Sequence, residues 1–170
     1  VGCISNSVSS TVSVSALPVI SVNSGSICAG KAFTITATGA ASYAVSGNTM
    51  VVSPSTTSNY TVTGTSSVGC NSSNTVVATV TVNQLPTVSV NSGTICAGNV
   101  FTINPTGAAS YTVAGGSLTV SPSSNSTYTV IGSSSVGCVN ASPVTASVTV
   151  NALPVISVSS TTNTLCQGST

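Results

Sequence analysis

The sequence has almost no charge. Among its 170 residues there is one Lys, and there is no Arg, His, Asp or Glu. A Ser-His-Asp triad is therefore excluded, and any Ser or Thr nucleophile would have neither the imidazole nor the carboxylate that normally activates it. Carboxylate cages for Ca²⁺ or Mg²⁺ are excluded for the same reason. We expect no enzyme activity and no cofactor.

The same scarcity argues against two kinds of binding. Attachment to a nucleic-acid backbone requires several Lys and Arg side chains, and Lys31 alone cannot neutralise the phosphates. Polar residues interrupt every apolar stretch before it reaches the roughly 20 residues that a membrane-spanning helix needs. We therefore expect neither nucleic-acid binding nor membrane insertion.

Small hydroxyl side chains and β-branched residues are abundant instead. The chain contains 35 Ser and 27 Thr, 41% of its residues are hydrophobic, and the mean hydropathy is +0.55. A disordered chain combines low hydrophobicity with high net charge, which is the opposite composition. Val, Ile and Thr favour pleated strands because they branch at Cβ. The composition predicts an all-β protein.

An internal repeat organises the whole chain. Residues 17–84 align with residues 85–152 without gaps, and 42 of the 68 positions are identical. Residues 1–16 match the end of such a repeat, and residues 153–170 match the beginning of another. We therefore expect two complete repeats of about 68 residues, flanked by two fragments, within a longer array.

Each repeat shows the period-two alternation of strands. In the stretch 75–83, for example, Val76, Ala78, Val80 and Val82 share one face. The first repeat has candidate strands near residues 18–23, 32–38, 42–46, 50–53, 59–65 and 75–83, separated by turn residues. Six or seven short strands per repeat are typical of a small antiparallel sandwich of immunoglobulin-like type.

Four cysteines recur at matched positions. Cys28 and Cys96 precede the second predicted strand of each repeat, and Cys70 and Cys138 follow the penultimate one. Those points can lie at the same end of an antiparallel sandwich. The sequence therefore predicts Cys28–Cys70 and Cys96–Cys138 disulfides, each stabilising its repeat by about 4 kcal/mol through loop closure.

The remaining two cysteines lie in the flanking fragments. Cys3 and Cys166 would be unpaired, or would bond to cysteines of neighbouring repeats. A zinc site is disfavoured, because the sequence has no His and no CxxC pair. Disulfides predict an oxidising, extracellular setting.

The motifs resemble a known family. The string ICAG…FTITATGAASY…SPSTTSNYTVTGTSSVGC…VATVTVNQLP is similar to the immunoglobulin/PKD-like repeats of Bacteroidota surface proteins. The resemblance covers essentially the whole chain. It implies a β-sandwich fold, a cell-surface location, export by a route such as type IX secretion, and a stalk, adhesive or filament role. Such repeats often carry Trp where this chain has Val45 and Val113, and acidic residues where it has Ser66 and Ser67.

The junctions between repeats contain no glycine linker. Each is marked by a Leu-Pro pair, and the proline restricts the backbone. The three pairs are Leu17 and Pro18, Leu85 and Pro86, and Leu153 and Pro154. Consecutive repeats are therefore predicted to stack end to end with little freedom to hinge.

These observations predict a structural role. We expect a rigid extracellular fibre or stalk on the cell surface, stabilised by disulfides. Its expected partners are copies of itself, joined end to end, with side-by-side assembly as a further option. One alternative is a polymer of short subunits in which the strand around Val8 and Val14 completes a neighbouring sandwich. Another is an adhesive or carbohydrate-binding module with an unknown glycan or host ligand. The four tyrosines fall at matched positions and are expected to pack in the cores.

Overall fold

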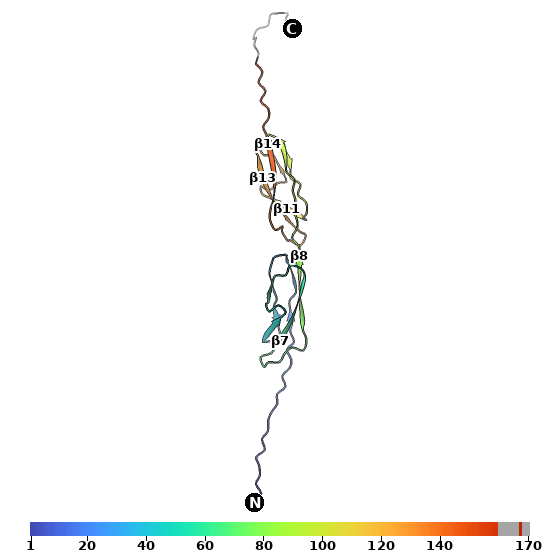
Figure 1. The fold of residues 1–170 in the computed structure, drawn as a ribbon, viewed down its shortest axis with the longest axis vertical. Helices are drawn as coiled ribbons and strands as arrows, with labels where there is room; N and C mark the ends of the chain where they lie inside the picture. Colours follow the sequence, from blue (N-terminus) through green and yellow to red (C-terminus); the bar gives the residue numbers. More distant parts are fainter. Residues whose placement is uncertain (160–166, 168–170) are drawn as a thin grey trace. The chain divides into compact units, whose positions relative to one another are not determined.

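The chain forms two compact units that consist of strands. The computed structural model describes residues 1–159 and 167, and in these residues it contains no helix. The units span Val1–Leu85 and Pro86–Thr170 and are called unit 1 and unit 2 below (Figure 1). The prediction of an all-β protein with two similar repeated units is confirmed.

The two units contain corresponding strands. Unit 1 has β1 (Ser21–Val22), β2 (Gly25–Cys28), β3 (Phe33–Thr34), β4 (Ala37–Thr38), β5 (Ser42–Val45), β6 (Val51–Val52), β7 (Ser58–Thr65) and β8 (Val76–Asn83). Unit 2 has β9 (Gly93–Cys96), β10 (Phe101–Thr102), β11 (Ser110–Val113), β12 (Thr119–Val120), β13 (Ser126–Ser133) and β14 (Val144–Asn151).

The larger sheet of unit 1 is mixed rather than purely antiparallel. Its strand order is β2-β8-β7-β5. Strands β5, β7 and β8 pair antiparallel, whereas β2 runs parallel to β8, with Gly25 opposite Val80 and Cys28 opposite Asn83. The expectation of an antiparallel sheet was therefore wrong for this one pair. A second layer consists of the short pairs β1–β4 and β3–β6.

The core of unit 1 lies between these two layers. Val62 from β7 and Val80 from β8 are fully buried, and Ile35, between β3 and β4, packs in the same cluster. The alternating pattern explains the burial, because every second residue of β7 and β8 points inward. Half-buried rings complete the cluster, among them Phe33, Tyr43 and Tyr60.

Unit 2 repeats this arrangement with small local changes. Its larger sheet has the order β11-β13-β14-β9, again with a parallel outer pair, β9 and β14. A single bridge between Ser89 and Thr106 takes the place of the β1–β4 pair. Its core contains Ile103, Val130 and Ala146, at positions that correspond to those of unit 1.

The flanking segments form no strand where they are described. Side chains of residues 1–16 are exposed, including Val8, Val12 and Val14, and residues 152–159 are exposed as well. The predicted domain fragment 153–170 lies partly outside the described residues, and so does Cys166.

Candidate functional site: the two poles of each unit

Each unit has two ends at which the matched cysteines lie. We define the C-terminal pole as the end where the last strand finishes, at Asn83 in unit 1 and at Asn151 in unit 2. The N-terminal pole is the opposite end, where that last strand begins. In unit 1, Val62 of β7 faces Val76 there. The chain enters each unit near its N-terminal pole, since Ile20 lies against Gly64 near the end of β7 and Val88 lies against Gly132 near the end of β13. It leaves each unit at the C-terminal pole.

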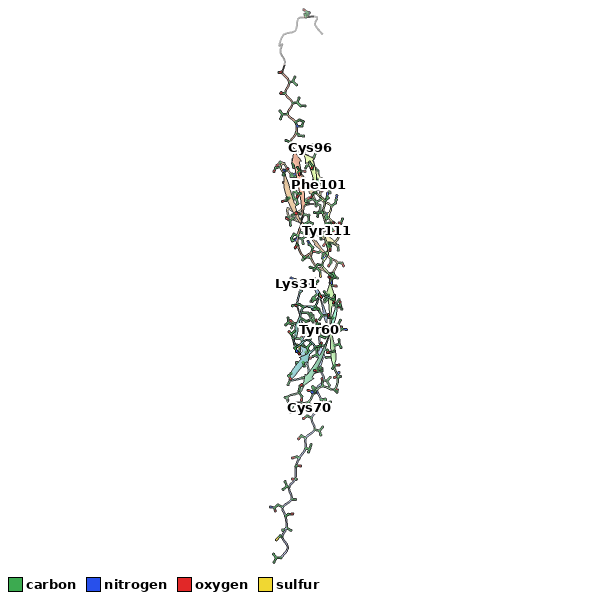
Figure 2. The ribbon with its side chains drawn as sticks, viewed as in Figure 1. Lys31, Tyr60, Cys70, Cys96, Phe101 and Tyr111 are labelled. Carbon is green, nitrogen blue, oxygen red and sulfur yellow. The ribbon has the colours of Figure 1, made fainter. Side chains whose placement is uncertain are left out.

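The structure separates the cysteines that were predicted to pair. Cys28 lies at the C-terminal pole because it is in register with Asn83. Cys70 lies beyond the other end of the sheet, where its carbonyl accepts a hydrogen bond from Ser66 N at 2.8 Å. Figure 2 shows Cys70 and Lys31, three residues after Cys28, at opposite ends of unit 1. From Val76 to Asn83 alone the sheet rises roughly 23 Å at about 3.3 Å per residue.

A disulfide cannot span this distance, because it requires Cα atoms within about 7 Å of each other. The predicted Cys28–Cys70 bond is therefore wrong, and Cys70 carries a free thiol. The predicted Cys96–Cys138 bond is wrong for the same reason, since Cys96 is in register with Asn151 and is also free. Each first cysteine ends a strand, β2 or β9, that runs parallel to the last strand of its unit, and it therefore lies at the C-terminal pole rather than at the pole of the second cysteine.

The redox states of the cysteines divide them into two groups. Cys28 and Cys138 are disulfide-bonded. Cys3, Cys70 and Cys96 carry free thiols, and Cys3 and Cys96 are exposed. A structural disulfide is typical of proteins outside the reducing cytoplasm and hints at such a location here.

A tight turn carries the cysteine at the N-terminal pole. In unit 2 this turn runs from Ser134 to Cys138. Cys138 N donates to Ser134 Oγ at 3.1 Å, and Ser134 N donates to the Cys138 carbonyl at 2.8 Å. Gly137, at a φ of 84°, allows the chain to reverse, because that region is strained for residues with a side chain. The turn exposes Val136, and Cys138 is 1% exposed.

A polar side chain next to the turn hydrogen-bonds to two backbone groups, one of which belongs to a buried glycine. In unit 2, Asn140 Oδ1 accepts from Gly132 N at 2.9 Å, and Asn140 Nδ2 donates to the Ser142 carbonyl. In unit 1, Ser72 Oγ makes both contacts, accepting from Gly64 N at 3.2 Å and donating to the Asn74 carbonyl at 2.9 Å. This contact fixes the loop that carries the cysteine against the sheet.

A tyrosine hydroxyl fixes the neighbouring loop in each unit. Tyr43 Oη accepts from Ala40 N and donates to the Ala40 carbonyl, both at 2.9 Å. Tyr111 Oη makes the same two contacts with Ala108 at 2.8 and 3.0 Å. These rings are half-buried, and Tyr60 and Tyr128 pack against the cores as well, so the prediction that the tyrosines are core residues is confirmed.

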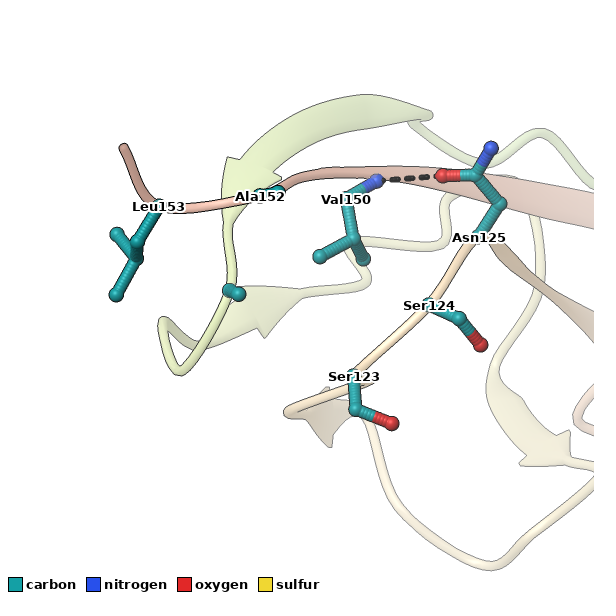
Figure 3. Close-up of a pocket in the computed structure, with 7 residues that line it drawn as sticks. Ser123, Ser124, Asn125, Val150, Ala152 and Leu153 are labelled. Carbon is teal, nitrogen blue, oxygen red and sulfur yellow. Dashed lines mark hydrogen bonds between the residues drawn. The ribbon is translucent and has the colours of Figure 1, made fainter. Parts of the chain in front are cut away.

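The C-terminal pole of unit 2 contains an open hollow. Its volume is about 560 Å³, and its apolar lining includes Ala97, Val150 and Leu153. Asn125 closes one side, where its Oδ1 accepts from Val150 N at 2.8 Å (Figure 3). Ala97 directly follows Cys96, whose thiol is free and exposed.

The Leu-Pro pairs differ in burial. Pro18 is buried, Leu85 and Pro86 are half-buried, and Leu17, Leu153 and Pro154 are exposed. Residues 84–87 alone separate the end of β8 at Asn83 from Val88, which packs in the core of unit 2. The connection is therefore short.

Other candidate chemistry is sparse among residues 1–159 and 167. Lys31 is exposed. No group of three His, Cys, Asp or Glu side chains in this part of the chain could hold a metal ion. The described residues also include no helix with the length and apolarity needed to cross a bilayer. What the poles do offer is thiol and disulfide chemistry.

No protein-family model matches the chain, and no curated protein matches it either.

Proposed function

We propose that this chain is a structural component of an extracellular fibre or stalk, built from immunoglobulin-like units joined end to end. The single observation that carries the proposal is the path of the chain through each unit. The chain enters each unit near the N-terminal pole, where Ile20 lies against Gly64 in unit 1 and Val88 against Gly132 in unit 2, and it leaves at the opposite pole, where β8 or β14 ends. Repeats with this path extend an array in one direction as they are added.

The strand pairing supports the immunoglobulin-like part of the proposal. Two layers, one with four strands and one with short pairs, enclose a single core, and the first strand segments are divided between the layers. The tyrosine that hydrogen-bonds to backbone three residues earlier resembles the tyrosine corner of such sandwiches. Membership of the Bacteroidota surface repeats belongs to the proposal and rests on the sequence resemblance described above.

The connection between the two units and the uncharged surface support the proposal of a stiff fibre that associates with copies of itself. The short connection through Pro86 leaves few backbone angles that can hinge. A surface of Ser, Thr and Asn without carboxylates has little charge repulsion, and a net charge near zero favours association between copies. The disulfide agrees with an oxidising environment.

The adhesive alternative receives no comparable support. A carbohydrate-binding surface usually presents aromatic rings to its ligand, and the four tyrosines here pack against the two cores instead. We therefore retain a single proposed function.

Small-angle X-ray scattering of the purified chain tests the proposal. We expect an elongated particle whose distance distribution has two lobes and does not change between low salt and 1 M salt. The matched control is a variant with a Gly-Ser insertion between Gln84 and Leu85, which should broaden the distribution. A compact particle, or a wild-type profile as broad as that of the insertion variant, would contradict a stiff end-to-end array.

A further inference from the structure

We propose that the outer edge of β11 in unit 2 is a contact surface for a second copy of this chain. In this contact the β11 strands (Ser110–Val113) of the two copies pair antiparallel about a two-fold axis, and their sheets join side by side. The inference rests on the proposed fibre function and specifies how neighbouring fibres associate laterally.

The outer edge of β11 has backbone groups that no strand of the unit satisfies. The strand lies at one end of the sheet order β11-β13-β14-β9 and pairs only with β13. Residues of an antiparallel strand alternate between facing a neighbouring strand and turning away from it. Ala114 N donates to the Thr129 carbonyl at 2.9 Å, so Ala114 and Thr112 face β13. Tyr111 therefore turns its N–H and its carbonyl towards the outside of the sheet.

The sequence gives this edge none of the usual protection against pairing. Natural sheets guard their edges with charged side chains or proline, or cover them with another segment. Residues 108–114 contain no charge and no proline. An open hollow of about 470 Å³ lies beside the strand, lined by β11 and by residues 116–119. Leu118 belongs to this lining and is 41% exposed, so an apolar side chain lies open next to the unpaired backbone.

Other polar groups around the hollow are paired with each other. Gly116 N donates to the Val113 carbonyl at 2.9 Å. Ser117 Oγ donates to the Thr119 carbonyl at 2.8 Å and accepts from Thr119 N at 3.1 Å. The backbone of Tyr111 is thus the hydrogen-bonding group that a strand from outside can engage.

A second copy of the same edge supplies the complementary groups. Two residues directly opposite each other in an antiparallel pair can exchange both N–H···O=C bonds. If Tyr111 of one copy lies opposite Tyr111 of the other, each copy donates once and accepts once, and the contact is symmetric. A charged edge would repel itself in such a contact, whereas this edge is neutral. Pairing also covers the hollow, which buries part of Leu118.

Unit 1 presents the corresponding edge in β5. Ser46 N donates to the Thr61 carbonyl at 2.9 Å, so Tyr43 turns its backbone outward as Tyr111 does. Met50 takes the sequence position of Leu118 but packs against the core, so the edge of unit 2 is the more apolar of the two. Each contact is small, but a fibre repeats it in successive units, and contacts that are linked along one chain reinforce each other.

Sedimentation velocity of the full chain, with its free thiols alkylated, tests the inference. We expect the average mass to rise from monomer towards dimer with concentration, equally in low salt and in 1 M salt. Leu118→Ser should weaken this association by roughly twofold or more at both salt concentrations, because less apolar surface is buried.

Charges introduced at Thr112 identify the contact as a symmetric one. With the two Tyr111 residues opposite each other, the exposed Thr112 side chains of the two copies are diagonal neighbours, about 7–8 Å apart. Thr112→Lys and Thr112→Glu should each weaken association about threefold in low salt, and an equimolar mixture of the two variants should associate more tightly than either alone. In 1 M salt, where the Debye length is about 3 Å, these differences should disappear. Thr145→Lys is the matched control, since it places the same charge on the exposed side of the central strand β14 and should change nothing.

Three results would overturn the edge contact. One is a chain that stays monomeric at every concentration, and another is a Lys and Glu mixture that associates no better than the separate variants. The third concerns the exposed segment 1–16, which could cover the edge in place of a second β11. Val12→Pro combined with Val14→Pro would then weaken association, whereas we expect no change. The scattering experiment above, made on the dilute chain, is independent of these outcomes, so an elongated monomer that does not associate would refute the edge contact and leave the proposed fibre architecture standing.

Discussion

At their N-terminal poles, units 1 and 2 use different side chains to accept a hydrogen bond from the same backbone position. A buried glycine N–H needs an acceptor there, and Ser72 Oγ provides it in unit 1 whereas Asn140 Oδ1 provides it in unit 2. Each side chain also donates to a carbonyl two residues later. The comparison shows that the hydrogen bonds are retained although the residue is exchanged. The requirement at this position is a group that both accepts and donates.

A second comparison concerns packing that both units share. In unit 1 a Cβ added at Gly39 would lie 1.9 Å from the Val19 carbonyl oxygen, and in unit 2 a Cβ at Gly107 would lie 1.9 Å from the Thr87 carbonyl oxygen. Both glycines have positive φ angles, 98° and 93°. The entry segment of each unit thus lies directly against a glycine at which any side chain would collide with backbone atoms.

The largest expected effect on stability comes from adding a side chain at one of these glycines. Gly39→Ala should destabilise unit 1 by about 3 kcal/mol or more, because backbone atoms must move to relieve the collision. Unit 2 should keep its stability. Hydrogen exchange followed by mass spectrometry resolves the two units, and exchange should accelerate only in peptides of unit 1.

Gly47→Ala is the matched control for this experiment. Gly47 has a φ of 95°, close to that of Gly39, but no atom lies within 4 Å of the added Cβ. This variant should lose about 1 kcal/mol from backbone strain alone. Equal losses in the two variants would show that the close approach of Val19 has no energetic role.

The second largest effect is expected at Asn140, whose role Ser72 takes in unit 1. Asn140→Ala should destabilise unit 2 by about 2 kcal/mol, because Gly132 N–H stays buried without an acceptor. Asn140→Ser should cost less than about 1 kcal/mol, since Ser makes both contacts in unit 1. Urea denaturation monitored by tyrosine fluorescence gives the difference. If Asn140→Ser were as destabilising as Asn140→Ala, then Ser72 and Asn140 would not have equivalent roles in the two units.

The smallest expected effect compares the tyrosine hydroxyls. Tyr43→Phe and Tyr111→Phe should each lower the free energy of unfolding of their own unit by about 1 kcal/mol, and by similar amounts, because each hydroxyl makes two backbone hydrogen bonds. Tyr60→Phe is the control, since the Tyr60 hydroxyl makes no hydrogen bond with the described residues. It should change stability by less than about 0.5 kcal/mol. Calorimetric unfolding of the three variants would disprove this ranking if Tyr60→Phe proved equally costly.

Much of the fold was predictable because its long strands show the alternation of apolar and polar residues in their own sequence. The alternation in 75–83 corresponds to β8 (Val76–Asn83), and the predicted strand 59–65 corresponds to β7 (Ser58–Thr65). Period-two burial needs no knowledge of distant residues. Because the two repeats align without gaps, each strand predicted in the first repeat also predicted a strand at the corresponding position of the second.

The strand that escaped prediction is β2 (Gly25–Cys28). It begins with a glycine, and a Cβ there would lie 2.6 Å from the Phe33 ring, so the position is occupied by a side chain from another strand. Its parallel pairing with β8 joins segments about 55 residues apart, and no local pattern encodes it. The incorrect disulfides follow from this omission, because the direction of β2 decides at which pole Cys28 lies.

The parallel alignment of β2 and β8 has a mechanical consequence. When the two ends of a unit are pulled apart, β2 is drawn towards one end and β8 towards the other. The hydrogen bonds between Gly25–Cys28 and Val80–Asn83 are then loaded together and must rupture in shear, whereas a hairpin pulled from its open end would unzip one bond at a time. Tension along the chain therefore meets its greatest resistance at the pairing of β2 with β8, which local sequence patterns did not reveal.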